Sequence, residues 1–185
     1  IKLTWDASDC GKSFNVYRSA NASNFEKIST TKNLEFTDSN LDGGKKYSYK
    51  VAGISQIGEG ALSAETKSLL SAPSHPESLE ITQIDSAHIG LKWKKVDTST
   101  KYRIYVSENK ASGFQEIKST SDQYSVLSGL KSDTIYYLKV TAENPGGESE
   151  LSEPISARTL PPPPTGVKVK ALNTTSLLIQ WDLLK

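Results

Sequence analysis

The residue types that most often perform catalysis or bind metals are few in this sequence and lie far apart. The 185 residues include one cysteine, Cys10, and two histidines, His75 and His88. No base lies near Cys10 in the sequence to activate its thiol as a nucleophile, and this set fits no metal-ligand spacing. The carboxylates are scattered, without a pair marked out for acid–base catalysis. The sequence therefore predicts no enzyme activity, no cofactor and no metal site.

Two glycine-rich segments, QIGEG and NPGGES, lack the features of a phosphate-binding loop. Such a loop needs a following helix and a lysine, whereas glycine is explained more simply by turns with positive φ. The formal net charge is +1, which argues against nucleic acid as a partner because phosphate binding needs a basic face. The sequence contains no run of about 18 apolar residues, so it does not predict a membrane-inserted segment. Since the sequence begins at Ile1, we expect it to be part of a longer protein.

The three tryptophans reveal an internal repeat. Trp5, Trp93 and Trp181 are spaced 88 residues apart, and they end the similar segments IKLTW, IGLKW and LLIQW. Downstream positions match at an offset of 88 or 89 residues, including Tyr17 with Tyr105, Leu41 with Leu130, Tyr47 with Tyr136 and Val51 with Val140. A fixed period of this length indicates tandem structural units.

Each unit is built from short segments in which apolar and polar residues alternate. In repeat two, Ile89, Leu91 and Trp93 alternate with polar or small residues. A second alternating segment begins with Tyr136 and Leu138. This period of two predicts strands with one face on a core. About seven such strands per unit, separated by turn-forming clusters, predict an all-β, two-sheet sandwich. A single cysteine means that core packing has to stabilise it without an internal disulfide.

Proline-rich segments mark the boundaries between the units. SAPSHP at 71–76 and LPPPPTG at 160–166 each precede a new first strand, and proline favours an extended, semi-rigid connector. We expect repeat one at 1–73, without its first strand, and a complete repeat two at 74–160. Residues 161–185 hold the first two strands of a third repeat, GVKVKAL and SLLIQW.

The pattern resembles the fibronectin type III domain across the whole chain. The resemblance is carried by the repeated tryptophan, by the L-x5-Y step from Leu41 to Tyr47 and from Leu130 to Tyr136, and by NPGGESELS before the last strand of repeat two. It implies tandem immunoglobulin-like sandwiches of seven strands, in which Tyr47 and Tyr136 are tyrosine corners with buried rings. FNVYRSANASNFEKI and YRIYVSENKASGFQEI are most similar to modules of secreted or surface bacterial proteins, and receptor ectodomains are the other home of the family.

One group of side chains is a candidate ligand site. If the strands pair as in the family, Tyr137 points outward beside Tyr105, and Arg103 and Lys139 share that face. Exposed aromatic residues can stack on a sugar or anchor a protein contact. The alternative is a cross-strand pair that stabilises the sheet by roughly 0.2–1 kcal/mol. The alternative is favoured because the counterparts in repeat one are Tyr17 and Ser48, so that the pair does not recur.

Two further features concern modification and self-association. Asn21-Ala-Ser and Asn173-Thr-Thr match the N-glycosylation sequence, which matters only in a eukaryotic secreted protein. Without a first strand, Ile1–Trp5 is an open sheet edge to which a strand of another copy could be added. The tail at 161–185 is too small to fold alone, and we expect it to pack irregularly or to pair with a neighbour.

Three functions remain open. The leading one is a non-catalytic, extracellular spacer that presents or docks other parts of a secreted or surface protein. The second is a module that binds a polysaccharide or a protein through the aromatic face of repeat two. The third is part of a cell-adhesion receptor. The resemblance implies the extracellular location in all three cases.

Overall fold

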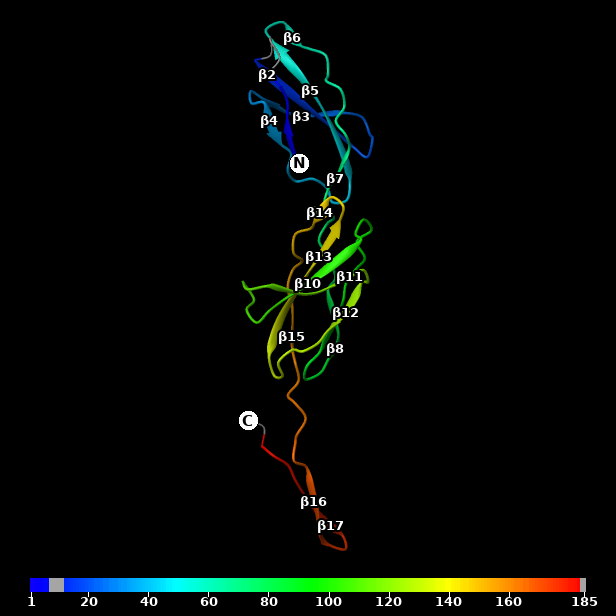
Figure 1. Cartoon of the computed structure of the whole chain (residues 1–185), viewed down its shortest axis with the longest axis vertical. Helices are drawn as coiled ribbons and strands as arrows, with labels where there is room; N and C mark the ends of the chain where they lie inside the picture. The colour runs from blue at the N-terminus through cyan, green and yellow to red at the C-terminus, as the bar shows by residue number, and fades with distance from the viewer. Residues whose placement is uncertain (7–11, 184–185) are drawn as a thin grey trace.

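The alternating segments of the sequence form strands that assemble into two sandwiches and one hairpin. The structure is a computed structural model, and it describes residues 1–6 and 12–183. Every regular element in these ranges is a β-strand. Figure 1 shows repeat one, repeat two and the hairpin following one another along the long axis. Within the described part of the chain, no helix is long and apolar enough to cross a membrane.

Repeat two has the seven strands that were predicted, with its last strand divided in two. One sheet has the order β12-β9-β8, and the other has the order β11-β10-β13-β14 with β15 also paired to β13. The strands are β8 (Glu80–Ile84), β9 (Ile89–Lys92), β10 (Lys101–Ser107), β11 (Gln115–Thr120), β12 (Tyr124–Leu127), β13 (Ile135–Asn144), β14 (Gly147–Glu148) and β15 (Ile155–Arg158). All pairs are antiparallel.

Repeat one has the same arrangement without a counterpart of β8 among the described residues. The sheet β3-β2-β5-β6, with β7 paired to β5, lies against the pair β1-β4. The strands are β1 (Lys2–Thr4), β2 (Ser13–Ala20), β3 (Glu26–Thr31), β4 (Glu35–Thr37), β5 (Lys46–Ser55), β6 (Gly58–Glu59) and β7 (Leu69–Leu70). The all-β fold class expected from the sequence, with two-sheet sandwiches in tandem, is confirmed.

The inward positions of the alternating pattern form the cores. In repeat two, Leu91, Ile104, Leu138 and Val140 are fully buried between the two sheets. The tryptophan that marks each repeat packs edge-to-face on an aromatic ring of the opposite sheet. The ring centroids are 5.6 Å apart for Trp5 and Phe14 and 5.3 Å apart for Trp93 and Tyr102. The recurrence of tryptophan at this spacing is therefore explained by core packing.

Both tyrosine corners form as predicted. Tyr136 is 6% exposed, and its hydroxyl oxygen accepts the Lys131 N–H at 2.9 Å. Tyr47 is 2% exposed and accepts the Asp42 N–H at 3.1 Å. The adjacent Tyr137 is only half-buried, because neighbouring residues of a strand point to opposite faces.

The core of repeat one contains a charged group that repeat two lacks. Asp38 is 6% exposed, accepts the Tyr49 hydroxyl at 2.8 Å, and lies 3.2 Å from the Arg18 guanidinium. Burial and the bond to Asp38 raise the pKa of Tyr49 well above its usual value. At the offsets of the repeat, the same three positions in repeat two hold the apolar residues Val106, Leu127 and Leu138.

The segment after repeat two forms a hairpin that pairs with itself. Strands β16 (Lys168–Asn173) and β17 (Ser176–Gln180) are antiparallel neighbours, and all their residues are exposed. The Asn173 side-chain oxygen accepts the Thr175 N–H at 2.9 Å, which closes the turn. The expectation of irregular packing was therefore wrong, since a local turn suffices to pair the two strands. Pairing of this tail with a neighbouring copy stays a prediction. Trp181 is 59% exposed here, unlike Trp5 and Trp93.

Candidate functional site

The outward face of repeat two brings the predicted ligand residues together on two neighbouring strands. In the register of β10 and β13, Tyr105 lies opposite Lys139 and Tyr137 lies opposite Ser107. Tyr137 is therefore a diagonal neighbour of Tyr105, and Arg103 lies two residues before Tyr105 on the same face of β10. All four residues share one face of the sheet, as the alternation predicts. Their contacts decide what this face can do.

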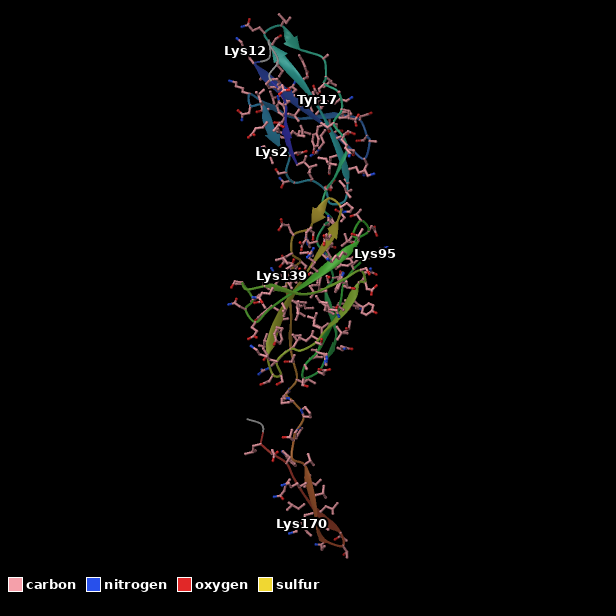
Figure 2. All side chains as sticks on the ribbon, in the orientation of Figure 1. Lys2, Lys12, Tyr17, Lys95, Lys139 and Lys170 are labelled. Atoms are coloured by element: carbon pink, nitrogen blue, oxygen red, sulfur yellow. The ribbon has the colours of Figure 1, made fainter. Side chains whose placement is uncertain are left out.

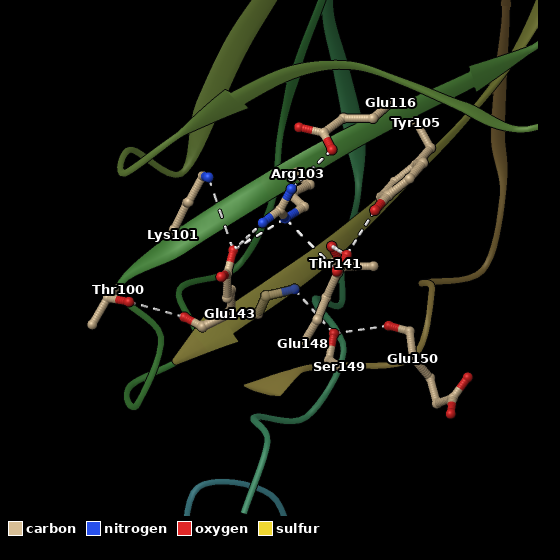
Figure 3. A network of polar contacts seen from close by, with 11 residues as sticks. Thr100, Lys101, Arg103, Tyr105, Glu116, Thr141, Glu143, Glu148, Ser149 and Glu150 are labelled. Carbon is tan, nitrogen blue, oxygen red and sulfur yellow. Dashed lines mark hydrogen bonds and ion pairs between the residues drawn. The ribbon is translucent and has the colours of Figure 1, made fainter. Parts of the chain in front are cut away.

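Arg103 is held by three carboxylates. Its Nε and Nη2 donate to Glu143 at 3.0 and 2.9 Å, and its Nη1 donates to Glu116 at 3.0 Å. Glu148 is a further 3.7 Å from Nε. Figure 3 shows the guanidinium between these groups. The hydrogen bonds that Arg103 donates to Glu116 and Glu143 raise its pKa above the usual value. The guanidinium is committed to its own sheet, and an incoming anion would have to compete with these carboxylates.

Tyr105 is bonded to Glu148 from the short strand β14. The Tyr105 hydroxyl donates to Glu148 Oε1 at 2.7 Å, and the Thr141 hydroxyl donates to the same oxygen at 2.6 Å (Figure 3). Partial burial and this bond raise the pKa of Tyr105 to about 12. Although burial acts to raise the pKa of Glu148, the bonds from Thr141 and Tyr105 lower it overall. The pair joins β10 to β14 across β13.

Lys139 lies over an aromatic ring instead of facing a ligand. Its ammonium nitrogen is 4.8 Å from the centroid of Phe114, within the range of a cation–π contact. Repeat one contains the same contact, with the Lys50 nitrogen 4.4 Å from the centroid of Phe25. Figure 2 shows Lys139 on repeat two and other lysines distributed over the length of the molecule.

The tyrosine–glutamate bond also recurs in repeat one. Tyr17 donates to Glu59 Oε1 at 2.7 Å, and these residues correspond to Tyr105 and Glu148. The recurrence of Tyr17 and Tyr105 was noted from the sequence. The recurrence of Glu59 and Glu148 at the repeat spacing was missed, although it was equally visible. Tyr137 differs from the other three residues of the face. Its hydroxyl takes part in none of the hydrogen bonds found in the described part of the chain, and its counterpart Ser48 is buried.

The predicted glycosylation residues both lie in exposed turns. Asn21 follows β2 with a left-handed φ of 50°, and its side-chain oxygen accepts the Lys46 N–H at 3.0 Å. Asn173 ends β16, and its side-chain oxygen accepts both the N–H and the hydroxyl of Thr175. In each case the oxygen of the amide is engaged. The nitrogen, which would carry a glycan, makes no hydrogen bond within the described ranges.

The remaining residues considered for chemistry lie apart. His88 is 2.9 Å from Asp85 in an exposed turn, while His75 is in the segment between the repeats. No group of three or more potential metal ligands occurs among residues 1–6 and 12–183. Cys10 lies outside the described residues.

Comparisons with known proteins agree with this architecture. The model of the family described as Fibronectin type III domain matches residues 74–158, so repeat two is such a domain. Receptor-type tyrosine-protein phosphatase F of Danio rerio is 31% identical over 168 residues, covering 85% of this chain and 9% of the relative. Protein sidekick-1 of Gallus gallus is 26% identical over 165 residues, covering 79% of this chain and 8% of the relative.

Two further matches complete the comparison. Tyrosine-protein phosphatase Lar of Drosophila melanogaster is 26% identical over 145 residues, covering 73% of this chain and 7% of the relative. The crystal structure of chicken CNTN1 FN1-FN3 domains is 21% identical, with a TM-score of 0.44, and covers 86% of this chain and 62% of that one. The chain thus spans less than a tenth of each curated relative. These relatives are animal proteins, which does not support the predicted bacterial type.

Proposed function

We propose that this chain is a non-catalytic run of extracellular fibronectin type III modules that spaces and docks other parts of a larger cell-surface protein. The proposed modules are residues 1–73, residues 74–160 and the beginning of a third at 161–185. The relatives include receptor-type proteins of animals, which favours a cell-surface receptor over a secreted bacterial protein. Since the chain covers so little of each relative, catalysis in those proteins is not carried over to it.

The observation that carries this proposal is the internal bonding of the outward face. Tyr105 and Tyr17 occupy the same position in their repeats and donate to equivalent glutamates at the same distance of 2.7 Å. A ligand site specific to repeat two would not need this bond in repeat one. The shared purpose is structural, because in each repeat the bond connects the central strands to the short strand that begins the last one.

A pair of substitutions tests the proposal. We expect Tyr105→Phe to reduce the stability of repeat two by roughly 0.5–1.5 kcal/mol, as for loss of one hydrogen bond, and to change no binding. Tyr137→Ser installs the residue of repeat one and is the matched binding variant. Both are made in the whole chain, which is displayed as a multimer against animal cell-surface ectodomains and insoluble polysaccharides. A ligand bound by the parent chain and lost in both variants would contradict the spacer function.

A second candidate function is protein binding through Tyr137. This side chain is half-buried, its hydroxyl has no hydrogen-bond partner in the described residues, and repeat one does not share it. An amphipathic aromatic residue of this kind is a frequent anchor of protein contacts. The receptor-type name of the Danio rerio relative favours a protein over a polysaccharide. Binding that is lost in Tyr137→Ser and retained in Tyr105→Phe would support this function, and sedimentation with a polysaccharide alone would reject the protein partner.

In an animal cell-surface protein, we further propose that Asn21 and Asn173 carry N-linked glycans. Both are exposed, and neither amide nitrogen has to break a hydrogen bond found in the described residues. The chain secreted from animal cells should show two mass decrements on treatment with peptide-N-glycosidase. Asn21→Gln and Asn173→Gln should each remove one. An unchanged mass in the parent chain would reject the modification at both residues.

A further inference from the structure

The segment between repeats one and two, which the sequence predicted as an extended, semi-rigid connector, is packed on both of them. Pro73 and Pro76 are buried, as is Ser71. By contrast, every residue from 160 to 180 is exposed, including the four prolines of the second connector. Figure 1 shows the first connector passing directly between two turns, and the second running on as a separate extended segment. The two connectors therefore differ although both are rich in proline.

Repeat one holds the start of the first connector through its turn between β4 and β5. The Ser71 hydroxyl accepts the Lys45 N–H at 3.0 Å and donates to the Asp42 carbonyl at 2.8 Å. The Ser71 N–H donates to the Lys45 carbonyl at 2.9 Å, and the Gly44 N–H donates to the Ala72 carbonyl, also at 2.9 Å. These bonds fix residues 71 and 72 to repeat one. Thr159 and Leu160 are held to repeat two in the same way, so what distinguishes the first connector is its contact with the following repeat.

Repeat two holds Ser71 from the other side. Asn144, which is 5% exposed, donates from Nδ2 to the Ser71 carbonyl at 3.0 Å, and its Oδ1 accepts the Gly146 N–H at 2.7 Å. One buried amide thus orders the turn after β13 and binds it to the connector. Moving the repeats apart would leave a buried amide and a buried carbonyl without partners, so this contact favours one relative position of the two repeats.

Glycines allow the backbones to approach this closely. A Cβ at Gly146 would overlap the Leu70 carbonyl oxygen and lie 2.6 Å from that of Ser71. A Cβ at Gly43 would overlap the Ser74 nitrogen in the same way. Both obstacles are backbone atoms, which cannot rotate aside as a side chain can.

The fold itself does not need glycine at positions 146 and 43, because the equivalent positions of the other repeat hold larger residues. Position 146 corresponds to Ile57 in repeat one, which is fully exposed at the tip of its turn. Position 43 corresponds to Ser132 in repeat two, next to the exposed second connector. Gly146 and Gly43 therefore lie where repeats one and two meet through a packed connector, whereas their larger counterparts Ile57 and Ser132 do not lie at this contact.

We infer that Asn144, Gly146, Gly43 and Ser71 form a clasp that fixes repeats one and two as one rigid unit. The clasp is an interaction surface whose partner is the neighbouring repeat of the same chain. A fixed orientation of the two repeats does not depend on what the chain binds or where it is located. The clasp refines the spacer function, because a stiff joint presents the ends of the two repeats in one fixed direction.

Distance distributions between spin labels test the inference in the whole chain. Cys10→Ser removes the native thiol, and labels are placed at the exposed positions Lys27→Cys, Ser119→Cys and Thr174→Cys. We expect a narrow distribution between 27 and 119, because repeats one and two both hold the segment between them. The distribution between 119 and 174, across the exposed segment at 160–166, is the reference for an unclasped joint. A 27–119 distribution as wide as this reference would overturn the inference.

Substitutions in the clasp then separate its contribution from general loss of structure. Gly146→Ala should widen the 27–119 distribution, whereas Gly60→Ala should not, because a Cβ there would lie at an ordinary 3.5 Å from the Gly53 carbonyl. If Gly146→Ala impairs folding, Asn144→Ser replaces it, since repeat one carries serine at that position. A 27–119 distribution that stays narrow in a folded clasp variant would contradict the inference.

Discussion

Asp38→Ala is expected to destabilise repeat one far more than removal of an ordinary surface charge. Asp38 is the acceptor for both the Tyr49 hydroxyl and the Arg18 guanidinium in a buried position. Without it, the hydroxyl of Tyr49 remains inside the core, where the ring is 1% exposed. The change therefore removes a bond and leaves a buried donor without a partner.

The expected magnitude follows from these contacts. An unsatisfied buried hydroxyl costs about 1–3 kcal/mol. The Arg18 side chain is 32% exposed and can regain water, so its lost ion pair adds at most about 1 kcal/mol. The sum of about 1–4 kcal/mol reaches at most the lower part of the range for breaking a fully buried ion pair. It corresponds to a roughly 5- to 700-fold loss of hydrogen-exchange protection.

A triple variant tests the reasoning from the opposite direction. Arg18→Val, Asp38→Leu and Tyr49→Leu together install the apolar residues of repeat two. Replacing a whole buried charged group with apolar residues is often neutral or stabilising, so we expect the triple variant to recover stability to within about 1 kcal/mol of the parent chain. The single and triple variants should thus differ although both remove Asp38.

Native-state hydrogen exchange with mass spectrometry can assign the loss to repeat one. Peptides from β2 and β5 report on repeat one, while peptides from β10 and β13 of the same molecule are the internal reference. Glu35→Ala is the control, because its ion pair with Lys2 joins side chains that are 58% and 60% exposed. A loss in Asp38→Ala no larger than in this control, or a triple variant as unstable as the single one, would refute the reasoning.

The remaining predictions concern the tyrosines of repeat two. The pKa of Tyr105 is raised from about 10 to about 12, so its contribution to stability is complete below pH 10 and is lost as the pH rises through 12. Tyrosinate absorbance should show several late-ionising groups, of which Tyr105→Phe removes one, and an unchanged titration would contradict the assignment. Tyr136→Phe should cost roughly 1–2 kcal/mol in denaturant unfolding because the Lys131 N–H loses its acceptor. Tyr137→Phe should cost less than about 0.5 kcal/mol, and equal losses would disprove the different roles of the adjacent tyrosines.

The strands, their inward faces and the tyrosine corners were predictable because each follows from a local period or a repeated spacing. Alternation placed Leu91 and Leu138 in the core, and the L-x5-Y step placed Tyr136 at its corner. The bonding of the outward face was only partly predictable. The sequence put Arg103 and Lys139 on the correct face, but alternation does not show which charges are paired with neighbours. Glu59 and Glu148 could have been recognised from the sequence, because glutamate recurs there at the repeat spacing.

The clasp and the buried charge of repeat one required the structure for a different reason. Both depend on contacts between segments far apart in the sequence, such as Asn144 with Ser71. Turn composition suggested positive φ for the glycines of NPGG, and Gly147 does have a φ of 130°. The requirement at Gly146 comes instead from the approach of another backbone. Similarly, the alternation in β2 places Arg18 on the inward face. Only its ion pair with Asp38 explains how a charged side chain is tolerated there.

The internal repeat supplies a criterion that a single domain would lack. Where both repeats keep the same residue types and contacts, as in the tyrosine–glutamate bond and the lysine over phenylalanine, the shared fold is a sufficient cause. Where they differ, the fold cannot be the cause, since each repeat forms it with a different residue. Gly146 against Ile57, Asp38 against Leu127 and Tyr137 against Ser48 are such positions. Gly146 is explained by the contact between the repeats, and Asp38 is explained by the different core of repeat one. Of these three differences, Tyr137 is the one that neither packing nor the contact between the repeats explains. Binding experiments should therefore begin with Tyr137.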